Sequence, residues 1–61
     1  MRKYLAFYDD GHDYGEFSFS SSHRANSKAN LADAKTAAQR KFGFKRAACI
    51  RITRTQLSME D

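Results

Sequence analysis

Apolar and polar residues alternate over the first third of the chain in a pattern that predicts two β-strands joined as a hairpin. The first strand is expected at residues 3–8 and contains the most apolar run of the chain, residues 4–8, which is rich in aromatic side chains. Residues 16–20 alternate regularly, with Phe17 and Phe19 on one side of the strand and polar residues on the other. The loop between the strands, residues 9–15, contains glycines and aspartates, which are typical of turns. We expect its tip to project.

Residues 20–27 form a polar connection, and after it apolar residues recur at the spacing of an α-helix. Over residues 31–42, one stripe of apolar positions recurs at helical spacing: Leu31, Ala34, Ala38 and Phe42. Either Ser27 or Asn30 can cap the start of this helix, because both side chains accept hydrogen bonds from free backbone N–H groups. Gly43 is suited to the position that follows the last turn.

A third strand is expected at residues 44–53. Its positions Ala48, Ile50 and Ile52 alternate with less apolar neighbours, and β-branched residues are enriched. Residues 55–61 have no clear period, and we expect them to form a frayed tail.

These elements predict one α+β domain, residues 1–61, with a three-stranded antiparallel sheet (ββαβ, order 2-1-3) and one helix packed on one face. The first strand takes the centre because it is the most apolar. Leu5 and Phe7 are expected beneath the helix, and Tyr4 and Tyr8 on the uncovered face. The rest of the expected sheet core is Phe17, Phe19, Phe44, Ala48, Ile50 and Ile52.

The composition of the 61-residue chain excludes several classes of protein. The one cysteine, Cys49, cannot form an internal disulfide, and no paired Cys and His residues predict a zinc site. No apolar run approaches the roughly 20 residues that a membrane span needs. We therefore expect a cytoplasmic protein with a reduced thiol. Because so short a chain buries only about 60% of its unfolded surface, association with a second copy or another protein is favoured.

Charge is distributed unevenly along the chain. The formal net charge is +4, but residues 17–54 carry +8, while residues 1–16 and 55–61 each carry −2. Such a basic middle indicates an anionic partner, although charge also keeps a small domain soluble.

The uncovered sheet face is the main candidate site. Two tyrosines beside an arginine, here Arg51, are typical of a stacking platform for single-stranded nucleic acid. Alternatively, Tyr4 and Tyr8 cover their neighbours or contact a second copy. The candidate nucleic-acid-binding residues are Tyr4, Tyr8, Arg24, Lys28, Arg40, Lys45, Arg46, Arg51 and Arg54.

The acidic loop offers a second surface. Its carboxylates and imidazole match no calcium-loop spacing, so turn formation explains them better than metal binding. An exposed acidic tip can also bind a basic partner. The candidate protein-interaction residues are Tyr4, Tyr8, Asp9, Asp10, His12 and Asp13.

No catalytic motif is present. Cys49, His12 and His23 do not form a recognisable nucleophile–base arrangement, and no phosphate-binding glycine loop occurs. We therefore expect a non-enzymatic protein without cofactor, metal or membrane contact, which binds nucleic acid. The alternative is a protein–protein interaction module: a homodimer, or an inhibitor or adaptor of a host protein, of the type that phages and mobile elements encode.

Overall fold

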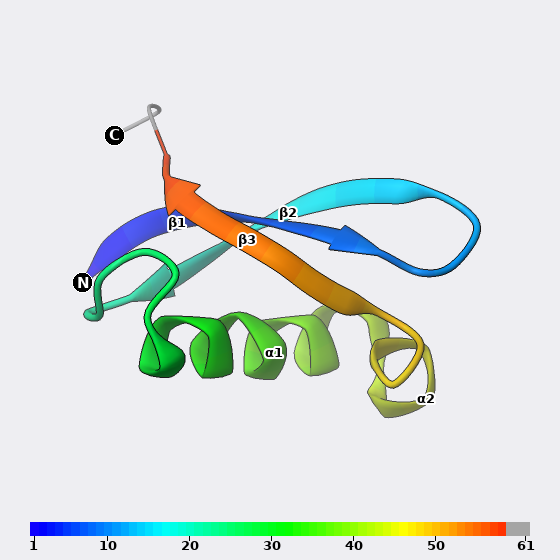
Figure 1. Ribbon diagram of the computed structural model, residues 1–61. Coiled ribbons are helices and arrows are strands. Elements are labelled where there is room, and N and C mark those ends of the chain that lie inside the picture. Colours follow the sequence, from blue (N-terminus) through cyan, green and yellow to red (C-terminus); the bar gives the residue numbers. More distant parts are fainter. Residues whose placement is uncertain (59–61) are drawn as a thin grey trace.

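The computed structural model describes residues 1–58 of the chain. Its elements are β1 (Arg2–Asp9), β2 (Tyr14–Ser21), α1 (Lys28–Phe42), α2 (Phe44–Ala47) and β3 (Arg51–Leu57). The strands form one antiparallel sheet in the order β2-β1-β3, and both helices lie on the same side of it (Figure 1). The predicted α+β class, the ββαβ order and the central position of the first strand are confirmed.

The ends of α1 follow the predicted signals. Ser27 is the N-cap, and its side chain accepts a hydrogen bond from the backbone N–H of Asn30 at 3.1 Å. The helix therefore begins at Lys28, before the predicted range. It ends as predicted at Phe42, and Gly43 follows with φ of 89°, a left-handed conformation that glycine adopts without a steric penalty.

The two faces of β1 are reversed relative to the prediction. Tyr4 and Ala6 are buried beneath α1, with 6% and 0% of their surface exposed, and Tyr8 packs against the same core. Leu5 and Phe7 point to the other side of the sheet, which no described helix covers. The prediction that Tyr4 and Tyr8 form an exposed platform on the uncovered face is therefore wrong.

The register between β1 and β2 explains this reversal. Tyr4 lies opposite Phe19, and Ala6 lies opposite Phe17. Residues directly opposite in neighbouring strands share a face of the sheet. Both phenylalanines are buried beneath the helix, as predicted, so their partners on β1 face the helix too.

Gly15 allows Tyr8 to enter the core. The two residues are partners across β1 and β2, and a Cβ atom at Gly15 would lie 2.5 Å from both Cζ and the hydroxyl oxygen of Tyr8. Without that Cβ, the Tyr8 ring reaches Phe17 and Phe42, with centroid separations of 5.9 and 5.8 Å. The resulting aromatic cluster fills the space between the sheet and the last turn of α1.

The third strand begins later than predicted. Residues 44–47 form the short helix α2, in which the N–H groups of Ala47 and Ala48 donate to the carbonyls of Gly43 and Phe44. Phe44 is consequently 76% exposed instead of lying in the core. The predicted core position Ala48 is also exposed, whereas Ala47 is buried.

β3 extends into the segment that was expected to fray. Thr55 is 1% exposed and lies opposite Ala6, and the buried Ser58 donates its backbone N–H to the Lys3 carbonyl at 2.9 Å, so the prediction is wrong for residues 55–58. The rest of the predicted tail, residues 59–61, lies outside the described residues. The pairing with β1 shifts register at Phe7, where the Thr53 hydroxyl donates to the Phe7 carbonyl at 3.1 Å.

A buried polar cluster connects β3 to the start of α1. Thr55 donates its hydroxyl to Asn30 Oδ1 at 2.6 Å, and its backbone N–H to Asn26 Oδ1 at 2.7 Å. Asn30, which is fully buried, also donates from Nδ2 to the His23 carbonyl at 3.0 Å. These mutual bonds satisfy the buried groups and fix the connection between β2 and α1 against the sheet.

Candidate nucleic-acid interface

The structure distributes the predicted nucleic-acid-binding residues over two opposite surfaces. Tyr4 and Tyr8 belong to neither, because they lie in the core. Arg51 and Arg54 lie on the uncovered side of the sheet. The others belong to the connection before α1 and to the two helices: Arg24, Lys28, Arg40, Lys45 and Arg46.

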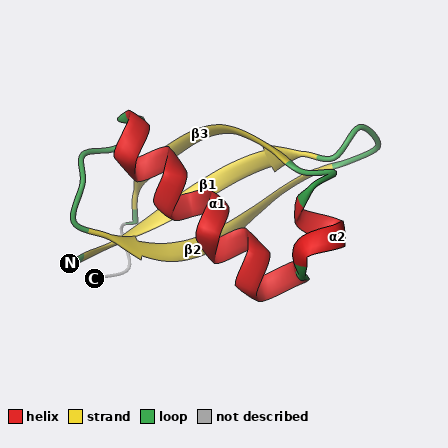
Figure 2. Cartoon of the chain, turned by 90° about the horizontal axis from the view of Figure 1, so that it is seen from below, coloured by secondary structure: helices red, strands yellow, loops and turns green. Residues whose placement is uncertain are grey.

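We call residues 22–49 the helix layer. α1 crosses the sheet, and α2 lies near one end of it (Figure 2). The seven basic residues of the layer are all exposed: Arg24, Lys28, Lys35, Arg40, Lys41, Lys45 and Arg46. Its single acidic residue, Asp33, is half-buried and accepts a hydrogen bond from the Ser21 hydroxyl at 2.6 Å. The outer surface of the helix layer is therefore strongly positive.

Most of these cations have no carboxylate partner. Within residues 1–58, the one ion pair joins Arg46 to Asp10, at 3.0 Å. The Arg46 side chain remains 57% exposed even there. The other basic side chains of the helix layer are solvated and can contact phosphates without first breaking an ion pair in the described part of the chain.

Phe44 adds an aromatic ring to this basic surface. It is the first residue of α2, is 76% exposed and directly precedes Lys45 and Arg46. The sequence analysis missed Phe44 as a site residue because it placed residues 44–53 in a strand. The signal was present, since two cations and two alanines after Phe44 do not alternate as strand residues do. Lys35 and Lys41 belong to the basic middle of the sequence but were not among the candidate nucleic-acid-binding residues.

The uncovered side of the sheet, which we call the open face, has a different character. From the strand registers, its side chains are Lys3, Leu5, Phe7, Asp9, Tyr14, Glu16, Ser18, Ser20, Arg51, Arg54 and Gln56. The Arg54 guanidinium lies 4.0 Å from the centroid of the Phe7 ring and donates to Gln56 Oε1 at 2.8 Å. Glu16 and Asp9 place negative charge on this face, so it suits a phosphate backbone less well than the helix layer does.

The acidic hairpin tip is stabilised by its own carboxylates. Asp9 Oδ1 accepts the N–H of Gly11 at 2.7 Å, and Asp10 Oδ1 accepts those of His12 and Asp13 at 2.9 and 2.8 Å. The N–H groups of Asp13 and His12, with a further contribution from Arg46, lower the pKa of the Asp10 carboxyl. Turn formation explains the carboxylates, as predicted.

The predicted protein-interaction residues are consequently divided. The Asp10 side chain is only 9% exposed, whereas His12 and Asp13 are exposed at the tip. Tyr4 and Tyr8 cannot form such a surface from the core. The interaction of the tip with a basic partner stays a prediction.

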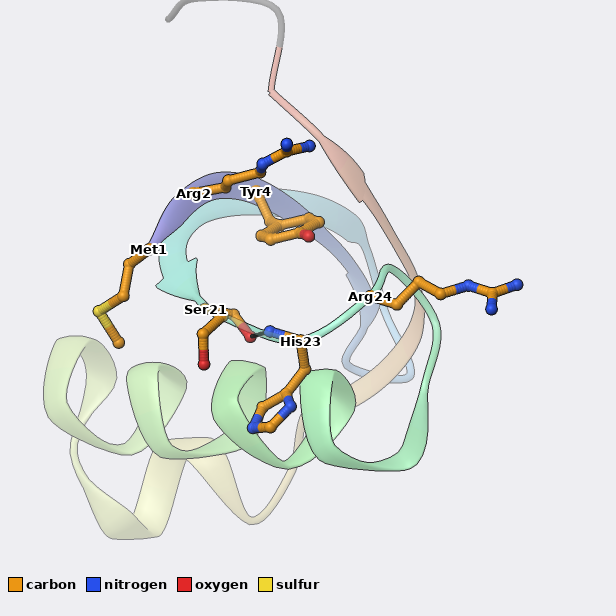
Figure 3. A pocket seen from close by; sticks show the side chains of 7 residues that line it. Met1, Arg2, Tyr4, Ser21, His23 and Arg24 are labelled. Atoms are coloured by element: carbon orange, nitrogen blue, oxygen red, sulfur yellow. Dashed lines mark hydrogen bonds between the residues drawn. The ribbon is translucent and has the colours of Figure 1, made fainter.

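A recess of about 430 Å³ opens at the far end of the sheet (Figure 3). Its lining residues are Met1, Arg2, Tyr4, Ser21, Ser22, His23 and Arg24. Arg24 extends away from the recess, and the His23 ring points toward α1 (Figure 3). Arg24 thus adds to the positive surface of the helix layer instead of closing a pocket.

The residues considered for catalysis form no bonded arrangement. Cys49 lies exposed after α2, and its Sγ contacts the Lys45 carbonyl at 3.7 Å. Within residues 1–58, no hydrogen bond joins Cys49 to His12 or His23. The same residues contain no group of three or more His, Cys, Asp or Glu side chains placed to hold a metal ion.

None of the described helices is long and apolar enough to cross a membrane.

Comparison of the chain with protein-family models, with curated proteins and with solved structures finds no match. The functional argument therefore depends on the residues of this chain alone.

Proposed function

We propose that this chain is a non-enzymatic protein that binds nucleic acid through its helix layer. The observation that supports this proposal is the exposure of seven Lys and Arg side chains on residues 22–49, beside a single carboxylate that is already hydrogen-bonded. Basic side chains that neutralise phosphates release condensed counterions, and this release drives binding without sequence preference.

Single-stranded nucleic acid fits this surface better than a duplex. Phe44 presents an exposed ring among the cations of α2 and of the last turn of α1, namely Lys45, Arg40 and Lys41. A ring in such a position can stack on an unpaired base, whereas the bases of a duplex are already stacked. The described helix layer has no other exposed Phe, Tyr or Trp side chain.

A fluorescence titration with labelled single-stranded and duplex oligonucleotides, at salt concentrations from about 50 to 200 mM, tests the proposal. We expect log affinity to fall linearly with log salt, with a slope near −0.7 for each contacted phosphate of a single strand. Absence of measurable affinity at low salt would contradict the proposal.

Two double substitutions, each of which removes two positive charges from one surface, show which surface contacts the nucleic acid. Lys35→Gln with Lys41→Gln removes two charges from the helix layer, and Lys and Gln have similar helix propensity. If both lysines contact phosphates of a single strand, the magnitude of the salt slope decreases by about 1.4, or about 0.7 for each contact. The matched control, Lys3→Gln with Arg51→Gln, removes two charges from the open face and should leave the slope nearly unchanged. Equal effects of the two pairs would argue against a specific helix-layer surface.

Phe44→Ala tests the stacking contact. Stacking of one base on an aromatic side chain contributes about 1–3 kcal/mol, so we expect single-strand affinity to fall by roughly 5- to 150-fold and duplex affinity to change little. Because Phe44 is largely exposed, the stability of the fold should stay within about 0.5 kcal/mol. The control is Tyr14→Ala, which removes an 86% exposed ring from the open face. A larger loss with Tyr14→Ala would place the single strand on the open face.

A second candidate function, protein–protein association, is favoured by the apolar centre of the open face.

A further inference from the structure

The open face has apolar side chains at its centre and no covering layer in the described structure. Leu5 and Phe7 lie on this side of β1, the central strand, while both helices lie on the other side (Figures 1 and 2). Sheets that are apolar on both sides are usually covered on both sides. We propose that the open faces of two copies of this chain pack against each other to form a homodimer.

The charges that flank Phe7 identify a second copy as the occupant. Glu16 lies opposite Phe7 on β2, and Arg54 lies opposite Phe7 on β3. One row of the face therefore runs from an acid through an apolar ring to a base. Glu16 and Arg54 are both exposed, and neither has an ion-pair partner within residues 1–58.

A two-fold axis parallel to β1 makes this row complementary to itself. The rotation places β1 over β1 of the second copy, and β2 over its β3. Each Glu16 then faces Arg54 of the second copy, and the two Phe7 rings lie near the axis, each with the Arg54 guanidinium of its own chain 4.0 Å from its centroid. The same pair of residues occurs twice, as an isologous interface requires. Face-to-face sheets that pack with roughly aligned strands have this arrangement.

The neighbouring rows are compatible with this packing. Leu5 lies between Ser18 and Gln56, so its row is uncharged. The axis places the two Asp9 carboxylates opposite each other; in each copy Arg51 lies beside Asp9 on β3, and Asp9 Oδ1 already accepts the Gly11 N–H. The axis also places the two Lys3 residues opposite each other at the end of the face, where their long side chains can turn outward.

The size of the face sets the affinity to expect. Three strands about 4.8 Å apart, with eight residues at about 3.3 Å each, form a patch only about 10–15 Å wide and 25 Å long. Such a patch is smaller than a standard interface of about 800 Å² for each partner. The dimer should therefore be weak, with an apparent Kd from roughly 10 μM to 1 mM. The homodimer does not depend on the proposed function, because the helix layers of both copies stay on the outside.

Sedimentation equilibrium on nuclease-treated protein at concentrations up to about 1 mM measures the association. We expect the mass to rise with concentration from the 7.0 kDa monomer toward twice that value. Glu16→Lys and Arg54→Glu should each weaken self-association at least tenfold, because each places like charges opposite one another. An equimolar mixture of the two variants should associate again, because the Lys and Arg of one chain then face the two glutamates of the other.

Three outcomes would overturn the homodimer. The first is a monomer mass for the wild-type chain at the highest concentration. The second is a wild-type dimer that neither substitution weakens, with both variants shown to be folded by circular dichroism. The third is an open face that binds oligonucleotide, seen in a monomeric protein as lower oligonucleotide affinity of Arg54→Glu and higher oligonucleotide affinity of Glu16→Lys. Recovery of association in the mixture of Glu16→Lys and Arg54→Glu supports a two-fold axis parallel to β1. An axis perpendicular to β1 would not bring Glu16 over Arg54 of the second copy.

Discussion

Ala34 and Ala38 determine how closely α1 approaches the sheet. Both are almost fully buried, at 0% and 2% exposure, and neither side chain separates the helix from the strands by more than a methyl group. The aromatic rings fill the remaining space around them, with Phe17 and Phe42 at 5.7 Å in an edge-to-face arrangement. Such close packing leaves little room for additional atoms.

Gly15→Ala tests that packing. The new methyl group would meet the Tyr8 ring, and Phe17 and Phe42 on its other sides oppose a shift of the ring. We expect the free energy of unfolding to decrease by about 1–3 kcal/mol, as for other overpacked cores. Urea denaturation followed by circular dichroism measures it, with the exposed Ser18→Ala on the same strand as the control. A Gly15→Ala variant as stable as the control would mean that Tyr8 does not occupy this position.

The alternation of side chains along β1 does not by itself show which side of the strand faces the helix. Tyr4, Ala6 and Tyr8 on one side are about as apolar as Leu5 and Phe7 on the other, so alternation alone gives two equivalent solutions. The structure selects between them through long-range contacts, because Tyr4 stacks on Phe19 at 5.7 Å and Tyr8 occupies the space over Gly15. Neither contact can be read from a local period.

At the scale of elements, the helix and the presence of a third strand were predictable, but the bounds of that strand were not. Ser27 and Gly43 are strong local end signals, and α1 follows both of them. The segment after Gly43 contains alternating apolar residues but forms local hydrogen bonds first, in α2, before β3 begins at Arg51. The candidate site depended on this difference, because α2 exposes Phe44 beside the cations.

The hairpin tip and α2 are connected by the ion pair of Asp10 with Arg46. The pKa of the Asp10 carboxyl lies below its ordinary value of 3.8, because the N–H groups of Asp13 and His12, and then Arg46, favour the charged form. A lowered pKa in the folded state stabilises the fold above pH 3.8, and this contribution is lost as the pH falls through the lowered value.

Asp10→Asn should therefore remove part of the acid dependence of stability. Asn keeps an oxygen acceptor for the two N–H groups but carries no charge for Arg46. We expect the variant to be less stable than the wild type at pH 6 and to approach it as the pH falls below 3.8, through the lowered pKa of Asp10. Thermal unfolding across this range measures the difference, with Asp13→Asn as the control for removing a negative charge from the same loop. Parallel pH curves for Asp10→Asn and the wild type would show that the Asp10 charge does not stabilise the fold.

At the scale of the whole molecule, charge is separated between its layers. The described helix layer is almost purely basic, while the hairpin tip and β2 carry most of the described acidic residues. The uneven charge along the chain was visible in the sequence, but its assignment to one layer required the fold. The open face and the helix layer point in opposite directions, so a face-to-face dimer leaves two basic surfaces available.

The most direct test of the helix-layer interface is a two-dimensional ¹H–¹⁵N NMR titration with a short single-stranded oligonucleotide. The account predicts that the largest amide shifts occur within residues 22–49, around Phe44 and the last turn of α1, and that they decrease as salt is raised. Shifts confined to the strands of the open face, or no shifts at low salt, would contradict it.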